Sequence, residues 1–162
     1  MILDWMLVTI AGWLLISLLG VACLRRTWLV SRLFFPAGGL LALVFAVLAV
    51  SALFSPPEVA ELALGLPGLP FHLRLDPLSA FFLAVIGGAG AGISIFAAGY
   101  FRHGEGTPPG LLCLEYYVFL ASMCLVVLAD DAYVFMVMWE TMALSSFFLV
   151  TTNHRVPSIR QA

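Results

Sequence analysis

The chain has 162 residues, of which 63% are hydrophobic and only 10% are charged, and its mean hydropathy is +1.11. A soluble domain carries about 25% charged residues, so this composition indicates a membrane protein and excludes an ordinary soluble domain. The net charge is −2, all the basic residues are arginines, and no cluster of them forms a surface for nucleic acid.

Five hydrophobic stretches follow one another along the chain, at residues 3–24, 33–54, 77–100, 112–129 and 131–151. Each has roughly 18 to 24 residues, which is enough to span a bilayer as a helix. The expected fold class is therefore all-α, a polytopic bundle of about five transmembrane helices in which residues 1–162 form a single membrane domain. The first stretch also has the length of a signal peptide, but its acidic start at Asp4 favours a retained helix.

The segments between the stretches differ in character. Residues 62–76 contain glycines and prolines followed by an alternating apolar and polar pattern, which predicts a short hairpin-like extracytoplasmic loop between the second and third helices. Residues 102–110 are rich in glycine and proline and are expected to be non-helical. Asp130 and Asp131 alone separate the last two stretches, which predicts an antiparallel pair of helices joined by a tight turn.

Arginine placement predicts the orientation of the bundle. Arginines follow the first, third and fifth stretches, whereas Arg74 alone lies on the other side. Because cytoplasmic loops are enriched in basic residues, the N-terminus is expected outside and the C-terminus in the cytoplasm. We expect a multi-pass protein of the inner (plasma) membrane of a bacterium or archaeon.

Glu140 is the main candidate for chemistry. It lies roughly 13 Å along a helix from Asp131, which is close to the middle of the hydrocarbon layer. A charged side chain there costs about 2.5–3.5 kcal/mol, and such residues usually carry protons or ions. The alternative is a neutral, structural acid that bonds a hydroxyl group of Thr141, Ser145 or Ser146.

Other polar residues give weaker signals. Glu115 opens the fourth expected helix, where it is either a headgroup-level acid or a point of proton entry. Asp76, Asp130 and Asp131 are expected to cap helices. The histidines are expected to be solvated, although His154 is also placed to feed protons from the cytoplasm.

Gly88 and Gly92 share a face of the third helix and predict a seam for helix packing. The three cysteines have no metal-ligand spacing. No cofactor, metal site or covalent catalytic group is predicted, so an active site within the chain is not expected.

Two stretches resemble a known family. The first is Leu75–Phe82, which reads LDPLSAFF and is followed by a glycine- and alanine-rich helix and Gly99-Tyr100. The second runs from Asp130 through MWETMALSSF, residues 138–147. Over most of residues 72–155 the chain resembles the antiporter-like membrane subunits of respiratory complex I, multisubunit Na⁺/H⁺ antiporters and membrane-bound hydrogenases. Within that superfamily it is most similar to hydrogenase-4 component B and the related formate hydrogenlyase subunit.

The resemblance implies that Glu140 is the fifth-helix glutamate, which works with lysines on later helices to pass protons across the membrane. This chain has no lysine and ends at Ala162, so we expect an N-terminal fragment or a split or truncated gene product, with a complete small subunit as the alternative.

The function implied is part of a proton-translocating subunit of a hydrogenase or NADH:quinone oxidoreductase type complex. Its expected partners are other membrane subunits of that complex and the lipid bilayer. The alternatives are a structural or assembly subunit without transport and a fragment of a Na⁺/H⁺ antiporter.

Overall fold

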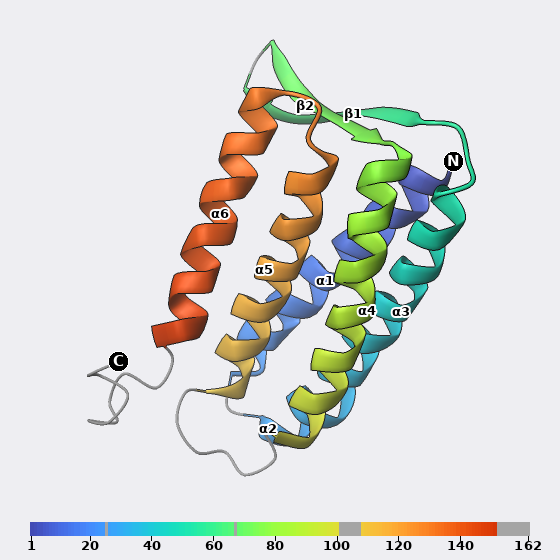
Figure 1. Ribbon diagram of the computed structural model, residues 1–162. Helices are drawn as coiled ribbons and strands as arrows, with labels where there is room; N and C mark the ends of the chain where they lie inside the picture. Colours follow the sequence, from blue (N-terminus) through green and yellow to red (C-terminus); the bar gives the residue numbers. More distant parts are fainter. Residues whose placement is uncertain (25, 67, 101–107, 152–162) are drawn as a thin grey trace.

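A computed structural model describes residues 1–24, 26–66, 68–100 and 108–151. Its long helices run side by side as a bundle (Figure 1): α1 (Ile2–Ala22), α3 (Phe35–Ala52), α4 (Pro77–Tyr100), α5 (Pro109–Leu128) and α6 (Ala132–Thr151). Within the described residues, five helical spans are long and apolar enough to cross a membrane. The expected all-α class is confirmed, and the chain is a multi-pass membrane protein.

Two helices begin earlier than the hydrophobic pattern predicts. The second span begins at Val30 with a π-helical turn, η1 (Val30–Phe34), and α2 (Thr27–Leu29) precedes it. Next to this turn Pro36 has no N–H to donate. Helix α5 begins at Pro109, so the expectation that residues 109 and 110 are non-helical is wrong. The physical reason is that proline in the first helical turn needs no donor and already has the helical φ.

The predicted hairpin is confirmed. Strands β1 (Glu58–Leu66) and β2 (Leu69–Leu75) pair in antiparallel register, and their turn region includes Gly65 and Gly68 at φ of 117° and 86°. The hairpin lies at the same end of the bundle as the start of α1 and the turn between α5 and α6 (Figure 1). It therefore joins elements that are far apart in sequence.

Glu58 caps the N-terminus of α1. Its two carboxylate oxygens accept hydrogen bonds from the backbone N–H groups of Ile2 and Leu3, at 3.0 and 2.8 Å. The first N–H groups of a helix have no partner within the helix, and a negative charge there also interacts favourably with the helix dipole. The cap comes from the hairpin and lies far from α1 in sequence, so it ties the first element of the chain to β1.

Asp131 joins the hairpin to α6. One carboxylate oxygen accepts the backbone N–H of Val134 at 2.8 Å, which caps α6 as predicted. The other accepts the backbone N–H of His72 at 3.2 Å and lies 3.1 Å from Nδ1 of its ring. In return the backbone N–H of Asp130 donates to the carbonyl of His72 at 3.0 Å. His72, expected to be a solvated histidine, is instead a docking residue of β2.

The cap at the start of α4 follows the local prediction. The Asp76 carboxylate accepts the backbone N–H of Ser79 at 2.7 Å, and this hydrogen bond lowers the pKa of Asp76. Pro77 follows as the first residue of the helix, which is the order that the sequence pattern predicts.

Glycines allow the helices to approach closely. A Cβ atom on Gly110 of α5 would collide with the carbonyl oxygen of Gly20 on α1, and one on Gly87 of α4 would lie 2.9–3.0 Å from Ala46 of α3. At the centre, Nε1 of Trp13 donates to the carbonyl oxygen of Gly38 at 3.1 Å. Helices in lipid gain little from hydrophobic burial, so close packing of this kind supplies much of their attraction.

Gly88 and Gly92 do not make the predicted seam within the described chain. Both are exposed, and a Cβ atom at either position would have no neighbouring atom within 4 Å. The inward face of α4 is formed instead by Gly87, Gly90 and the residues at helical spacing from them.

Gly110→Ala is expected to destabilise the bundle, whereas Gly88→Ala is the matched control. The methyl group at position 110 meets backbone atoms of α1, which cannot rotate away, so α1 and α5 must separate at a cost of about 1–3 kcal/mol. At position 88 alanine has open space and gains up to about 1 kcal/mol of helix propensity. Thermal unfolding of the purified protein in detergent measures both. Equal effects at the two sites would contradict the close crossing of α1 and α5.

Acid is expected to loosen the docking of the hairpin through Asp131. The N–H of Val134, and after it the backbone and ring N–H groups of His72, hold the pKa of Asp131 below its ordinary value of 3.8. Its stabilising contribution is therefore present above that value and is lost as the pH falls through the lowered pKa. The protection factors of the β2 amides, which are exchange rates compared with the intrinsic rate at the same pH, should fall on acidification to about pH 3. Asp131→Asn should weaken this acid response, and Asp130→Asn, the control, should preserve it.

Candidate functional site

Helix α6 lies at the edge of the bundle (Figure 1). It packs mainly on α5 and meets β2 at the hairpin end. Only 11% of the residues in its most apolar stretch are buried, compared with 33–50% in the other four spans. Most of its surface is therefore left uncovered by the described chain.

Glu140 lies on that uncovered surface. The face of α6 toward α5 contains buried Val134 and Ser145 and half-buried Thr141, at helical spacing. Glu140 lies on the exposed side of α6, together with the exposed large side chains of Met136, Trp139 and Phe147. A single carboxyl group near the middle of the span is thus surrounded by apolar and aromatic side chains.

The hydroxyl groups of Thr141 and Ser145, near Glu140 in sequence, donate their hydrogen bonds to backbone carbonyls. The Thr141 hydroxyl donates to the carbonyl of Val137 at 2.8 Å, and the Ser145 hydroxyl donates to the carbonyls of Thr141 and Met142. Among the described residues, no arginine or histidine forms a salt bridge with Glu140. The described chain thus supplies Glu140 with no cation, and its two nearest hydroxyl protons are bonded to the backbone of α6.

Glu115 lies deeper than the sequence suggests. Because α5 begins at Pro109, Glu115 falls in the second turn, and no acidic residue occupies the first turn. One of its carboxylate oxygens is buried. It lines a cavity of about 240 Å³ between α5 and α6, together with Leu114, Val118, Thr141, Leu144, Ser145 and Phe148. Its side chain therefore faces α6 and not the headgroup layer.

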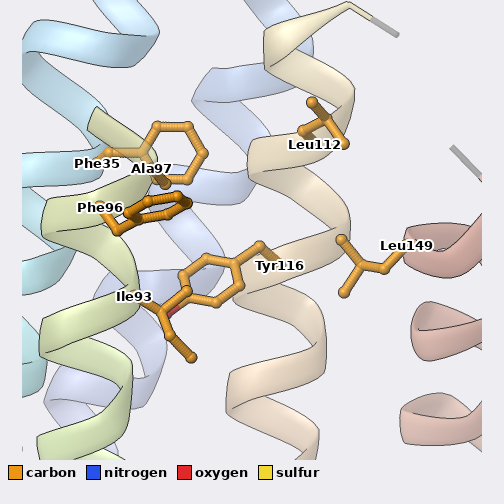
Figure 2. Close-up of a pocket in the computed structure, with 7 residues that line it drawn as sticks. All are labelled: Phe35, Ile93, Phe96, Ala97, Leu112, Tyr116 and Leu149. Atoms are coloured by element: carbon orange, nitrogen blue, oxygen red, sulfur yellow. The ribbon is translucent and has the colours of Figure 1, made fainter. Parts of the chain in front are cut away.

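A second cavity, of about 260 Å³, lies between α4, α5 and α6, and it is apolar (Figure 2). Leu149 of α6 points across it toward Tyr116 of α5, with Ile93 and Phe96 of α4 on the other side. Even the Tyr116 hydroxyl is occupied, since it donates to the carbonyl of Gly90 at 2.9 Å. This cavity offers space but no acidic or basic group.

The structure separates the predicted site residues. Glu140 and Glu115 lie on different helices, and only Glu115 faces the α5–α6 cavity, while Thr141, the residue after Glu140, lines the same cavity. His154 lies outside the described residues. The cavity itself was not predicted from the sequence. The signal that could have revealed it is the tight turn at Asp130, because Glu115 and Ser145 are equally far from it in sequence and so lie at similar depth in the antiparallel pair.

Comparison with known proteins gives the chain its relatives. A family model described as NADH-ubiquinone oxidoreductase (complex I), chain 5 N-terminus, matches residues 64–108. An uncharacterized protein of Mycobacterium tuberculosis strain H37Rv is 34% identical over 112 residues, covering 68% of this chain and 17% of that protein. Hydrogenase-4 component B of Escherichia coli K12 is 36% identical over 109 residues, covering 67% of this chain and 15% of that protein.

A third relative is NADH-quinone oxidoreductase subunit L of Escherichia coli K12, which is 33% identical over 118 residues, covering 69% of this chain and 19% of that protein. The matches to these three relatives thus cover about two thirds of this chain and less than a fifth of each relative.

Proposed function

Since the chain belongs to the antiporter-like superfamily of complex I-type membrane subunits and matches their N-terminal part, we propose that it forms part of a proton-translocating membrane subunit. Its proton movement would be coupled to electron transfer elsewhere in a hydrogenase or NADH:quinone oxidoreductase type complex. The observation that carries the proposal is Glu140, a single carboxyl group in the middle of α6 on the face that the described chain leaves uncovered.

The location of Glu140 favours contact between the uncovered face of α6 and further protein. Against lipid, a charged carboxylate at this depth would cost about 2.5–3.5 kcal/mol, and it would avoid that cost only by staying neutral. Covered by protein, the same group is removed from both lipid and bulk water by the apolar side chains of Met136, Trp139 and Phe147. A carboxyl group in such a setting responds strongly to a nearby charge, which is what a proton carrier requires.

The cation that works with Glu140 would come from outside these residues. The sequence has no lysine, and none of the described arginines pairs with Glu140. The resemblance to antiporter-like subunits implies lysines on further helices as partners. We therefore assign the uncovered face of α6 to contact with helices that supply such a charge.

The proposal includes an orientation. The hairpin, the start of α1 and the α5–α6 turn share one end of the bundle, and α2 lies at the opposite end (Figure 1). Arg26 directly precedes α2, and Arg32 lies in η1, which follows it. The distribution of all the arginines along the sequence supports placing the hairpin end outside and the other end in the cytoplasm.

Glu140→Gln is expected to abolish proton translocation by the assembled membrane complex. The amide keeps the shape of the side chain but cannot take up a proton, so pumping should fall by about tenfold or more. A pH-sensitive dye in sealed vesicles measures the proton flux, and reduction of the electron acceptor measures turnover in parallel. Glu140→Asp, which keeps a carboxyl group, should retain part of the pumping. Pumping at the wild-type rate by Glu140→Gln would leave only a structural role for this residue.

We propose that the exposed Gly88 and Gly92 face of α4 receives a helix of a partner subunit. The open space at both positions supports this, because small residues allow close approach of another helix.

Gly88→Leu is expected to reduce co-purification of partner subunits about tenfold, while the isolated chain keeps its unfolding temperature. Leu78→Ala, a change at another exposed position of α4, serves as the control for general surface effects. Normal assembly of Gly88→Leu would exclude a close helix contact at this face.

A further inference from the structure

The α5–α6 cavity combines an acid with two hydroxyl groups inside the membrane-spanning part of the bundle. Glu115 comes from α5, and Thr141 and Ser145 come from α6. Its volume of about 240 Å³ exceeds the roughly 30 Å³ that one water molecule occupies in the liquid. Size alone therefore allows several water molecules.

The hydroxyl geometry also favours water. Thr141 and Ser145 donate their protons to backbone carbonyls of α6, so their oxygen atoms are left as hydrogen-bond acceptors. The Glu115 carboxylate offers further acceptors, and one of its oxygens is buried. A water molecule donates two hydrogen bonds and needs two to four polar partners, which this cavity supplies. The cavity of Figure 2 has similar volume but no carboxyl group in its lining, so it is the internal contrast.

The cavity lies at a depth between the α2 end of the bundle and Glu140. Glu115 is roughly 9 Å along the axis from the start of α5, and Ser145 is roughly 9 Å from the end of α6, at the same end of the bundle. Glu140 is roughly 16 Å from that end, so it lies roughly 7 Å, or a little over one turn of α6, deeper than Glu115. Thr141 is adjacent to Glu140 in sequence and lines the cavity. The cavity is therefore an intermediate stage between the end of the bundle and Glu140.

We propose that the α5–α6 cavity holds water and that Glu115 is a protonation site within it, relaying protons between the α2 end of the bundle and Glu140. This relay rests on the proposed function of Glu140. In each step a hydronium ion gives its proton to the Glu115 carboxylate and becomes water. The neutral acid then returns the proton to water in the cavity, which passes it to the Glu140 carboxylate, and no other reactant is needed.

The water can be tested without any reference to transport. In the assembled complex, with the three native cysteines replaced by alanine, Ser145→Cys is compared with Leu149→Cys one turn further along α6. A small cationic methanethiosulfonate reacts with ionised thiols in water, and the Glu115 charge should attract it. The thiol of the Ser145→Cys variant should react about tenfold faster than that of the Leu149→Cys variant, because Leu149 lines the apolar cavity. Equal rates would overturn the water-filled cavity.

The relay is tested by proton flux in vesicles of the same complex. Glu115→Gln should lower pumping by about tenfold, as should Ser145→Leu, which fills the cavity. Leu149→Phe fills only the apolar cavity and should remain near the wild-type rate.

The outcomes separate the two proposals. Wild-type pumping by Glu115→Gln, with pumping lost in Glu140→Gln, would overturn the relay and leave the proposed function standing. Wild-type pumping by Glu140→Gln would overturn the proposed function, and with it the relay, while the labelling result would still decide whether the cavity holds water.

Discussion

The close approach of helices at small residues is the constraint on which the rest of this bundle depends. Lipid tails are as apolar as leucine, so burying an apolar side chain between helices gains little, and attraction must come from packing and from hydrogen bonds. The contacts of Gly110 with α1 and of Gly87 with α3 bring backbones together over long faces. These contacts order α1, α3, α4 and α5 and leave α6 held mainly by α5. The exposed position of Glu140 and the cavity beside Glu115 both follow from that unequal packing.

The two membrane acids occupy different environments for the same reason. Glu115 on α5 lines the cavity between α5 and α6, whereas Glu140 lies on the exposed side of α6 and is not among the residues that line it. A proton path that uses both must therefore pass around or through α6, and Thr141 and Ser145 are the polar residues of that helix on the side of the cavity. Polar residues in the membrane are costly and usually have a function, and Thr141 and Ser145 line the same cavity as Glu115.

Local signals in the sequence predicted much of the architecture. Hydropathy and length identified all the spans, and Asp76 before Pro77 and Asp131 before Ala132 correctly marked two helix starts, because a cap depends on neighbours within one turn. What the sequence could not reveal depends on distant residues. Glycines at 87, 88, 90 and 92 sit close together on α4, and only the positions of α3 and α5 decide which of them face inward. The apolar residues of α6 are spread around its whole circumference, so its pattern did not show which side α5 covers or that Glu140 would be exposed.

The Glu58 cap on α1 has a consequence for biogenesis. The N–H groups at the start of α1 are synthesised before the carboxylate that satisfies them, which follows more than fifty residues later, after α3. Until then these N–H groups must rely on water, which is present only outside the hydrocarbon layer. The cap can form only if α1 and α3 have been threaded so that residue 2 and residue 58 emerge on the same face of the bilayer. This carboxylate cap thus forms only when the first two spans have been inserted in opposite directions.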